Sequence, residues 1–334
     1  MKNKTGFVFL GFLCLILWSG MLSAQTTPEP ATKFIYDFIP QTSDLVMLVQ
    51  PDILFRHPAL TRIQESGDFK RLKKDLAIFP WKTPPNKTYP DVLFTFFFDS
   101  RNYSMLLDTG KNIEQMYQDL AKKYAGQANV KIQKGRKNQF HLIRLIFLRP
   151  EKKDGDRCYD LVYLADHIAV YTNYRNQMQW QQWGSSNYSA AYAVKLKDFK
   201  DQDIVMGFSG NPGKFFLDPT GVLRRLKYFD FYFSSSDQQS ISLLCTAHCK
   251  SENKQDVARV ATQIHSYLKI LLVIFFGADQ ELFKALSDNC KVLTGGNMIR
   301  IKTELDTATL NAIRNYYQKH TEEMNRGAQQ QFSK

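Results

Sequence analysis

Three residues that commonly bind metals, Cys245, His248 and Cys249, lie close together in the chain. The segment 241–249 alternates apolar and polar residues, which predicts a half-buried strand. Side chains four residues apart on a strand share a face but are separated by about 13 Å, whereas disulfide-bonded cysteines need Cα atoms within about 7 Å. This spacing argues against a bond between Cys245 and Cys249 and places His248 on the opposite face. We therefore favour packed small side chains over a metal or thiol site, which stays a third functional hypothesis.

The chain has five cysteines, of which Cys14 lies in an N-terminal apolar run. The others, Cys158, Cys245, Cys249 and Cys290, are candidates for a disulfide or a reactive thiol if the protein is exported. Four cysteines allow three pairings, and the sequence leaves open whether any bond forms.

No catalytic, cofactor-binding or metal-binding residue is predicted. The nearest match to a serine-hydrolase turn, Gly207-Phe208-Ser209-Gly210-Asn211, lacks the final glycine and fits the end of a strand. Acidic residues such as Asp99 and Asp108 could form a pair only through folding. The histidines are scattered and show no ligand spacing; they are His57, His141, His167, His248, His265 and His320.

Two tryptophans, Trp180 and Trp183, lie in the polar stretch 177–192. Exposed aromatic residues of this kind contact sugars or protein partners. The alternative, which we favour, is a linker whose tryptophans pack between the two halves of the chain.

The N-terminus has the pattern of a secretory signal peptide. Lys2 and Lys4 precede an apolar run over 6–18, and the small residues Ser23 and Ala24 follow. We predict cleavage after Ala24, because the apolar run is shorter than the 20 or so residues that usually span a bilayer. The alternative is that the segment is retained as a membrane anchor. No later apolar stretch is long enough to form a transmembrane helix.

The charge of the chain indicates what partners to expect. The formal net charge is +12, and the basic residues form small clusters, including 70–74, 131–137 and 224–227. A solvated helix or hairpin face explains each cluster as well as a binding site does, so the sequence leaves the partner open. If the clusters bind, an anionic envelope surface or another envelope protein is the expected kind of partner. Exported proteins rarely meet nucleic acid, which is therefore not expected.

The order of predicted elements is the same in two halves of the chain. Strand, helix, strand, strand, helix and hairpin are expected over 34–175 and again over 203–320. Asn112 is a predicted helix N-cap, and Gly295-Gly296 predicts a tight hairpin turn. The remaining segments are a flexible leader (25–33), a linker (176–202) and a polar tail (321–334).

We therefore predict an α+β fold of two similar units, each an antiparallel sheet with helices, produced by internal duplication. A single α+β domain whose elements alternate by chance is the alternative. Helices should cover one face of each sheet, and the other face should pack against the remaining half of the chain or against a partner.

The opening FIPQTSDLVMLVQPDILFRHPAL combines a proline, an apolar strand and a short helix. In this order of elements the chain resembles uncharacterised bacterial exported proteins with repeated α+β units, and the resemblance supplies no site residues. Together these features predict a non-enzymatic exported protein, periplasmic or secreted, that serves as a binding or structural component of the cell envelope. The alternative is an exported hydrolase whose active site is assembled from residues distant in sequence.

Overall fold

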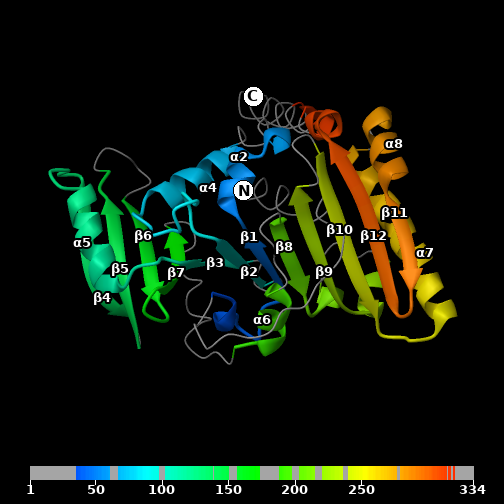
Figure 1. Ribbon diagram of the computed structural model, residues 1–334, viewed down its shortest axis with the longest axis horizontal. Coiled ribbons are helices and arrows are strands. Elements are labelled where there is room, and N and C mark those ends of the chain that lie inside the picture. Colours follow the sequence, from blue (N-terminus) through cyan, green and yellow to red (C-terminus); the bar gives the residue numbers. More distant parts are fainter. Residues whose placement is uncertain are drawn as a thin grey trace, which may run out of the picture.

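The chain folds as a mixed α+β protein with a large antiparallel sheet and several helices (Figure 1). It is described here from a computed structural model. The described residues are 35–60, 67–97, 102–137, 139–149, 156–173, 188–197, 203–214, 220–235, 240–276, 279–313, 315–316 and 319.

Within these residues, twelve strands form one continuous sheet in the order β11-β12-β10-β9-β8-β1-β2-β3-β7-β6-β5-β4, and every pair is antiparallel. The strands are β1 (Leu45–Val49), β2 (Val92–Phe97), β3 (Asn102–Asp108), β4 (Val130–Lys137), β5 (Phe140–Phe147), β6 (Arg157–Tyr163), β7 (Ile168–Asn173), β8 (Asp203–Ser209), β9 (Leu226–Ser235), β10 (Ser240–Cys249), β11 (Lys291–Gly295) and β12 (Met298–Asp306).

The helices are α2 (Pro51–Arg56), α4 (Gly67–Ala77), α5 (Ile113–Lys123), α6 (Ala190–Leu196), α7 (Lys254–Phe276) and α8 (Gln280–Asn289). Short 3₁₀ turns are η1 (Ile35–Phe38), η2 (Pro58–Leu60), η4 (Pro212–Lys214) and η5 (Val222–Arg225). Helix α6 lies inside the segment predicted to be a linker. Among the described residues, no helix is long and apolar enough to cross a membrane.

One face of the sheet is covered by most of the helices. Leu54 of α2, Leu76 of α4, Met116 of α5, Val257 of α7 and Leu282 of α8 all belong to the cores on this face. Their burial follows from helical periodicity, which gathers the apolar residues of each helix on one side.

The opposite face has a smaller core under η1 and α6, which contribute Phe38, Tyr192 and Leu196. Val46 and Leu48 of β1 point to this face, whereas the alternate residues of the strand enter the helix-covered core. A strand that is apolar throughout is therefore buried on both sides.

The two halves of the chain meet edge to edge, not face to face. Val46 of β1 pairs with Phe208 of β8, and Val49 pairs with Val205. This pairing of strands from the start of each half produces a single sheet.

Several local predictions are confirmed. Asn112 caps α5 by accepting a hydrogen bond from the backbone N–H of Gln115, and the Gln115 side chain completes a capping box. The predicted hairpin between β11 and β12 forms, but its turn lies one residue later than predicted, at Gly296 and Asn297. Gly295 is the last residue of β11 and pairs with Met298, and Gly296 has a φ of 60°. All the predicted hairpins form antiparallel pairs.

Candidate functional site

A group of polar and aromatic side chains lies on the less covered face, across strands β9, β10 and β12. Asp230 of β9 is opposite Thr246 of β10, which is opposite Arg300 of β12. Alternate residues of the same strands, such as Phe231 and Cys245, enter the core beneath α7. The two-residue period of the strands therefore directs the polar residues to the side away from α7.

Two rings form the centre of this group. The phenol ring of Tyr228 and the imidazole of His248 stack with centroids 4.1 Å apart and planes inclined by 26°. The two residues are opposite each other on β9 and β10. Helix α6 brings Lys195 to the same place, with its ammonium 5.5 Å from the Tyr228 ring centroid and 3.5 Å from Oδ2 of Asp230.

The electrostatics around His248 are strongly basic. Burial, and then the positive charges of Lys195, Lys227 and Arg300, lower the pKa of His248 to about 4. The imidazole is therefore neutral at pH 7 and can accept a hydrogen bond while cations surround it. We call Lys195, Lys227, Tyr228, His248 and Arg300 the basic patch.

Arg300 has an unsatisfied donor. Its Nε atom is buried and has no hydrogen-bond partner among the described residues. Lys195, by contrast, is close to the buried carboxylate of Asp230. A buried donor without an acceptor is costly, and Arg300 as a whole is partly exposed, so a small movement of its side chain would let a bound anion supply the acceptor.

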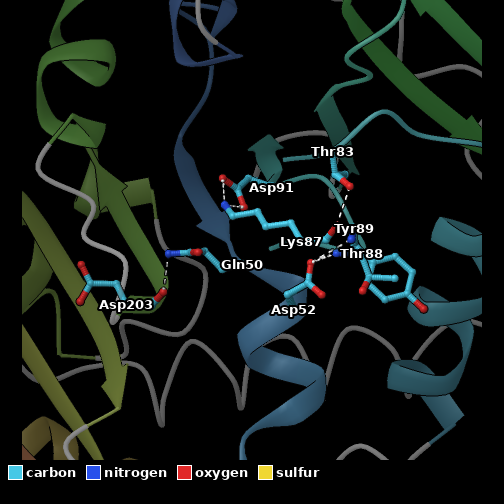
Figure 2. Close-up of polar contacts among 8 residues, drawn as sticks. All are labelled: Gln50, Asp52, Thr83, Lys87, Thr88, Tyr89, Asp91 and Asp203. Carbon is cyan, nitrogen blue, oxygen red and sulfur yellow. Dashed lines mark hydrogen bonds and ion pairs between the residues drawn. The ribbon is translucent and has the colours of Figure 1, made fainter. Parts of the chain in front are cut away.

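The start of α2 holds a second polar cluster, which joins the loop 82–91 to the sheet. Oδ2 of Asp52 accepts hydrogen bonds of 2.8 Å from the backbone N–H groups of Thr88 and Tyr89 (Figure 2). Lys87 donates to both carboxylate oxygens of Asp91 at 2.8 Å. Burial raises the pKa of Asp91, although the Lys87 hydrogen bond opposes that rise. These polar atoms are used within the protein, so the cluster fixes the loop.

The same region joins β1 to β8. Nε2 of Gln50 donates a 3.0 Å hydrogen bond to the backbone carbonyl of Asp203, which Figure 2 shows across the junction of the two strands. The Gln50 side chain thus extends the contact between the two halves beyond the last ladder pair.

Asp108 pairs with a histidine in the structure. Its Oδ1 lies 2.9 Å from Nδ1 of His167 and also accepts a hydrogen bond from the backbone N–H of Gly110. Asp91 is one position beyond the ladder pair Val92–Leu107 and so lies next to Asp108, whose charge contributes to the raised pKa of Asp91. No local pattern predicts the contact between Asp108 and His167, because the two residues are 59 positions apart in the chain.

The structure separates the cysteines as the strand pattern predicted. Cys245 and Cys249 are buried on one face of β10, and His248 points to the other. These two and the other cysteines in the described part of the chain, Cys158 and Cys290, are free thiols. Burial raises the pKa of Cys249 and of Cys290, which keeps both thiols protonated and unreactive at neutral pH. No group of three or more histidine, cysteine or acidic side chains among the described residues is arranged to hold a metal ion.

Ser209 has a structural role. The residue is buried, and its hydroxyl donates a 2.8 Å hydrogen bond to the backbone carbonyl of Asp44. Its proton is therefore engaged by the backbone, consistent with a strand end.

Several predicted features lie outside the described residues: Trp180, Trp183, Asp99, the signal peptide and leader, and the polar tail. The sequence interpretation did not identify Lys195 and Arg300 as site residues. The alternation of apolar and polar residues over 298–305 could have placed Arg300 on the polar face. No sequence pattern near α6 indicates that this helix lies against that face.

The comparisons with known proteins assign no family. No family model matches the chain, and no curated protein matches it. Among solved structures, the chain is similar to one described as crystal form I of TP0453, with 9% identity over 85% of this chain and 97% of that chain, and a TM-score of 0.44. At that level the similarity supports no argument about function.

Proposed function

We propose that this is an exported, non-enzymatic protein that serves as a binding component of the cell envelope and holds an anionic envelope molecule at the basic patch. The proposal rests on one observation above all. The buried Nε of Arg300 has no acceptor among the described residues, in a place where Lys195 and Lys227 also make the potential positive.

The neighbouring rings support the same proposal. The stacked rings of Tyr228 and His248 form a partly apolar surface beside the cations. A ligand with a ring and an acidic group could contact this surface while its anion reaches Arg300. Uronic-acid polymers and phosphorylated glycans have this combination.

A binding assay tests the proposal. The probe is polygalacturonate, and binding to the protein lacking residues 1–24 is measured by calorimetry at low salt. Arg300→Gln and Lys195→Gln are each expected to weaken binding about tenfold or more, because a charge-assisted hydrogen bond or ion pair is lost.

Lys284→Gln is the matched control, since Lys284 is exposed on α8, over the other face of the sheet. If all three variants lose the same amount of affinity, the binding of polygalacturonate depends only on the net charge of the protein, and the proposal of a basic patch is wrong. Binding of neutral dextran with the same affinity would also contradict it.

Export itself is part of the proposal. The basic, apolar and small-residue segments of 1–24 support a cleaved signal peptide. Expression of the full chain followed by cell fractionation and N-terminal sequencing should give an envelope or secreted protein that begins at Gln25. A full-length product in the cytoplasmic fraction would contradict export.

A hydrolase is the alternative, and the Asp108–His167 pair favours it. A carboxylate at 2.9 Å from Nδ1 orients an imidazole so that its Nε2 can act as a general base. A screen of ester, glycoside and phosphoester substrates with His167→Gln as the comparison tests this role. If the protein hydrolyses one of these substrates and His167→Gln abolishes that activity, the protein is a hydrolase and the binding proposal is wrong.

We also propose that the fold arose by duplication of one antiparallel-sheet-plus-helix unit. The order β1-β2-β3 followed by α5 and hairpins is similar to β8-β9-β10 followed by α7, α8 and a hairpin. In each half the third strand pairs with the last strand of the half, β7 or β12. The first unit then contains one extra hairpin, β4–β5. Superposition of the halves of a crystal structure tests this, and failure of the six shared elements to align would contradict it.

A further inference from the structure

Among the described residues the sheet ends at β4, an eight-residue strand that pairs with β5 alone. Figure 1 shows β4 and β5 at the end of the sheet remote from β11, beside α5. Residues 131 and 133–136 are exposed, and no described element covers most of this strand. The other edge strand, β11, has only five residues. An uncovered edge strand presents unpaired backbone N–H and C=O groups that can accept another strand.

The charges on β4 all have one sign. Lys131, Lys134 and Arg136 are exposed, and the strand contains no acidic residue. Lys134 forms an ion pair with Glu114, and its ammonium lies 4.4 Å from the Tyr117 ring centroid. Lys131 and Arg136 have no ion-pair partner within the described part of the chain.

The strand period divides these side chains between the two faces. Val130 and Ile132 pack against the core under α5. Lys134 and Arg136 continue the same face, and Lys131 lies on the other. One face of β4 therefore shows two apolar residues followed by two cations.

We propose that β4 binds an extended acidic segment of a partner protein, which adds to the sheet as a further antiparallel strand. The partner would carry glutamates opposite Arg136 and Lys134, then apolar residues opposite Ile132 and Val130. Backbone hydrogen bonds would hold the segment, and the alternate side chains would select it. This surface is separate from the basic patch, and its test does not depend on the anion proposed there.

Lysines on an edge strand also prevent identical edges from pairing, because like charges repel. That protective role and the proposed role predict different behaviour toward acidic partners. If the lysines served only to repel a second copy of the protein, an acidic peptide would not bind to β4 as an added strand.

The probe is a synthetic peptide of sequence Thr-Glu-Thr-Glu-Thr-Val-Thr-Val with a fluorescent label, titrated into the protein lacking residues 1–24. Arg136→Glu should weaken binding about tenfold or more, since a charge attraction becomes a repulsion. Lys291→Glu, on the β11 edge, is the matched control and should leave binding within about twofold, since it changes the same charge at the other end of the sheet. Circular dichroism establishes that both variants are folded.

A second peptide, N-methylated at alternate residues, keeps the glutamates but cannot form the backbone ladder. The proposal requires that this peptide bind at least tenfold more weakly, and that the unmodified peptide protect amides of β4 from hydrogen exchange. Equal binding of the two peptides would show a general polyanion surface and would overturn strand addition. Equal loss of binding in Arg136→Glu and Lys291→Glu would overturn it too.

Discussion

The imidazole of His248 stacks on the phenol ring of Tyr228, with centroids 4.1 Å apart, on the face of β9 and β10 that α7 does not cover. This contact partly buries a titratable ring next to three cations. The protonated form of His248 is therefore disfavoured in the folded chain.

The pKa of His248 gives a prediction for acid stability. The folded pKa of about 4 lies below the unfolded value of about 6.5, so the unfolded chain binds the extra proton first as the pH falls. The stabilisation is complete above about pH 6.5 and is lost as the pH falls toward 4. Because the ring is partly exposed and screened, we expect a loss of about 1–2 kcal/mol. Urea unfolding of wild type and His248→Phe at pH 7 and pH 4.5 measures it, and an equal pH dependence in both proteins would contradict the assignment.

The ion pair between Arg144 and Asp160 predicts that replacing Arg144 alone lowers the free energy of unfolding strongly. Nε and Nη2 of Arg144 donate to the two oxygens of Asp160 at 2.8 and 2.7 Å, and Asp160 is only 1% exposed. Arg144→Met leaves this carboxylate buried without its cation, which should cost about 3 kcal/mol of unfolding free energy. Adding Asp160→Leu should recover most of the loss in urea unfolding. A double variant less stable than Arg144→Met would exclude uncompensated charge as the cause.

Gly207 predicts a steric effect in the centre of the sheet. A Cβ atom at this position would lie 2.0 Å from Cζ of Phe231. Gly207→Ala should therefore destabilise the protein by about 1–3 kcal/mol, and Phe231→Leu should relieve part of that loss. Gly295→Ala is the control, because a Cβ there meets no atom within 4 Å. Thermal unfolding compares the variants, and a fully stable Gly207→Ala protein would contradict the close approach.

The buried hydroxyl of Thr172 predicts a substitution that does not lower the stability of the protein. Its Oγ1 is buried and has no hydrogen-bond partner within the described residues, although Thr172 lies opposite Asp160 on the neighbouring strand. Thr172→Val removes the unsatisfied group at nearly constant volume, so stability should be unchanged or rise by up to about 1 kcal/mol. A loss of more than about 1 kcal/mol in urea unfolding would indicate that the hydroxyl is hydrogen-bonded through water.

The sequence alone was sufficient for the local structure. Alternation over 241–249 predicted both the strand and the separation of His248 from Cys245 and Cys249, because side chains on a strand alternate between faces. The N-cap at Asn112 and the hairpin between β11 and β12 depend on residues within a few positions of each other. Short-range patterns therefore predicted them correctly.

Tertiary structure decided what these elements bring together. The pairing of β1 with β8 joins segments more than 150 residues apart. The apolar sequence of β1 predicts a buried strand but does not specify which strand lies beside it. In the same way, α6 brings Lys195 to Asp230 and β12 brings Arg300 to the face that holds His248. Periodicity determines which face a side chain takes, but the neighbours on that face depend on strand order, which local sequence does not specify.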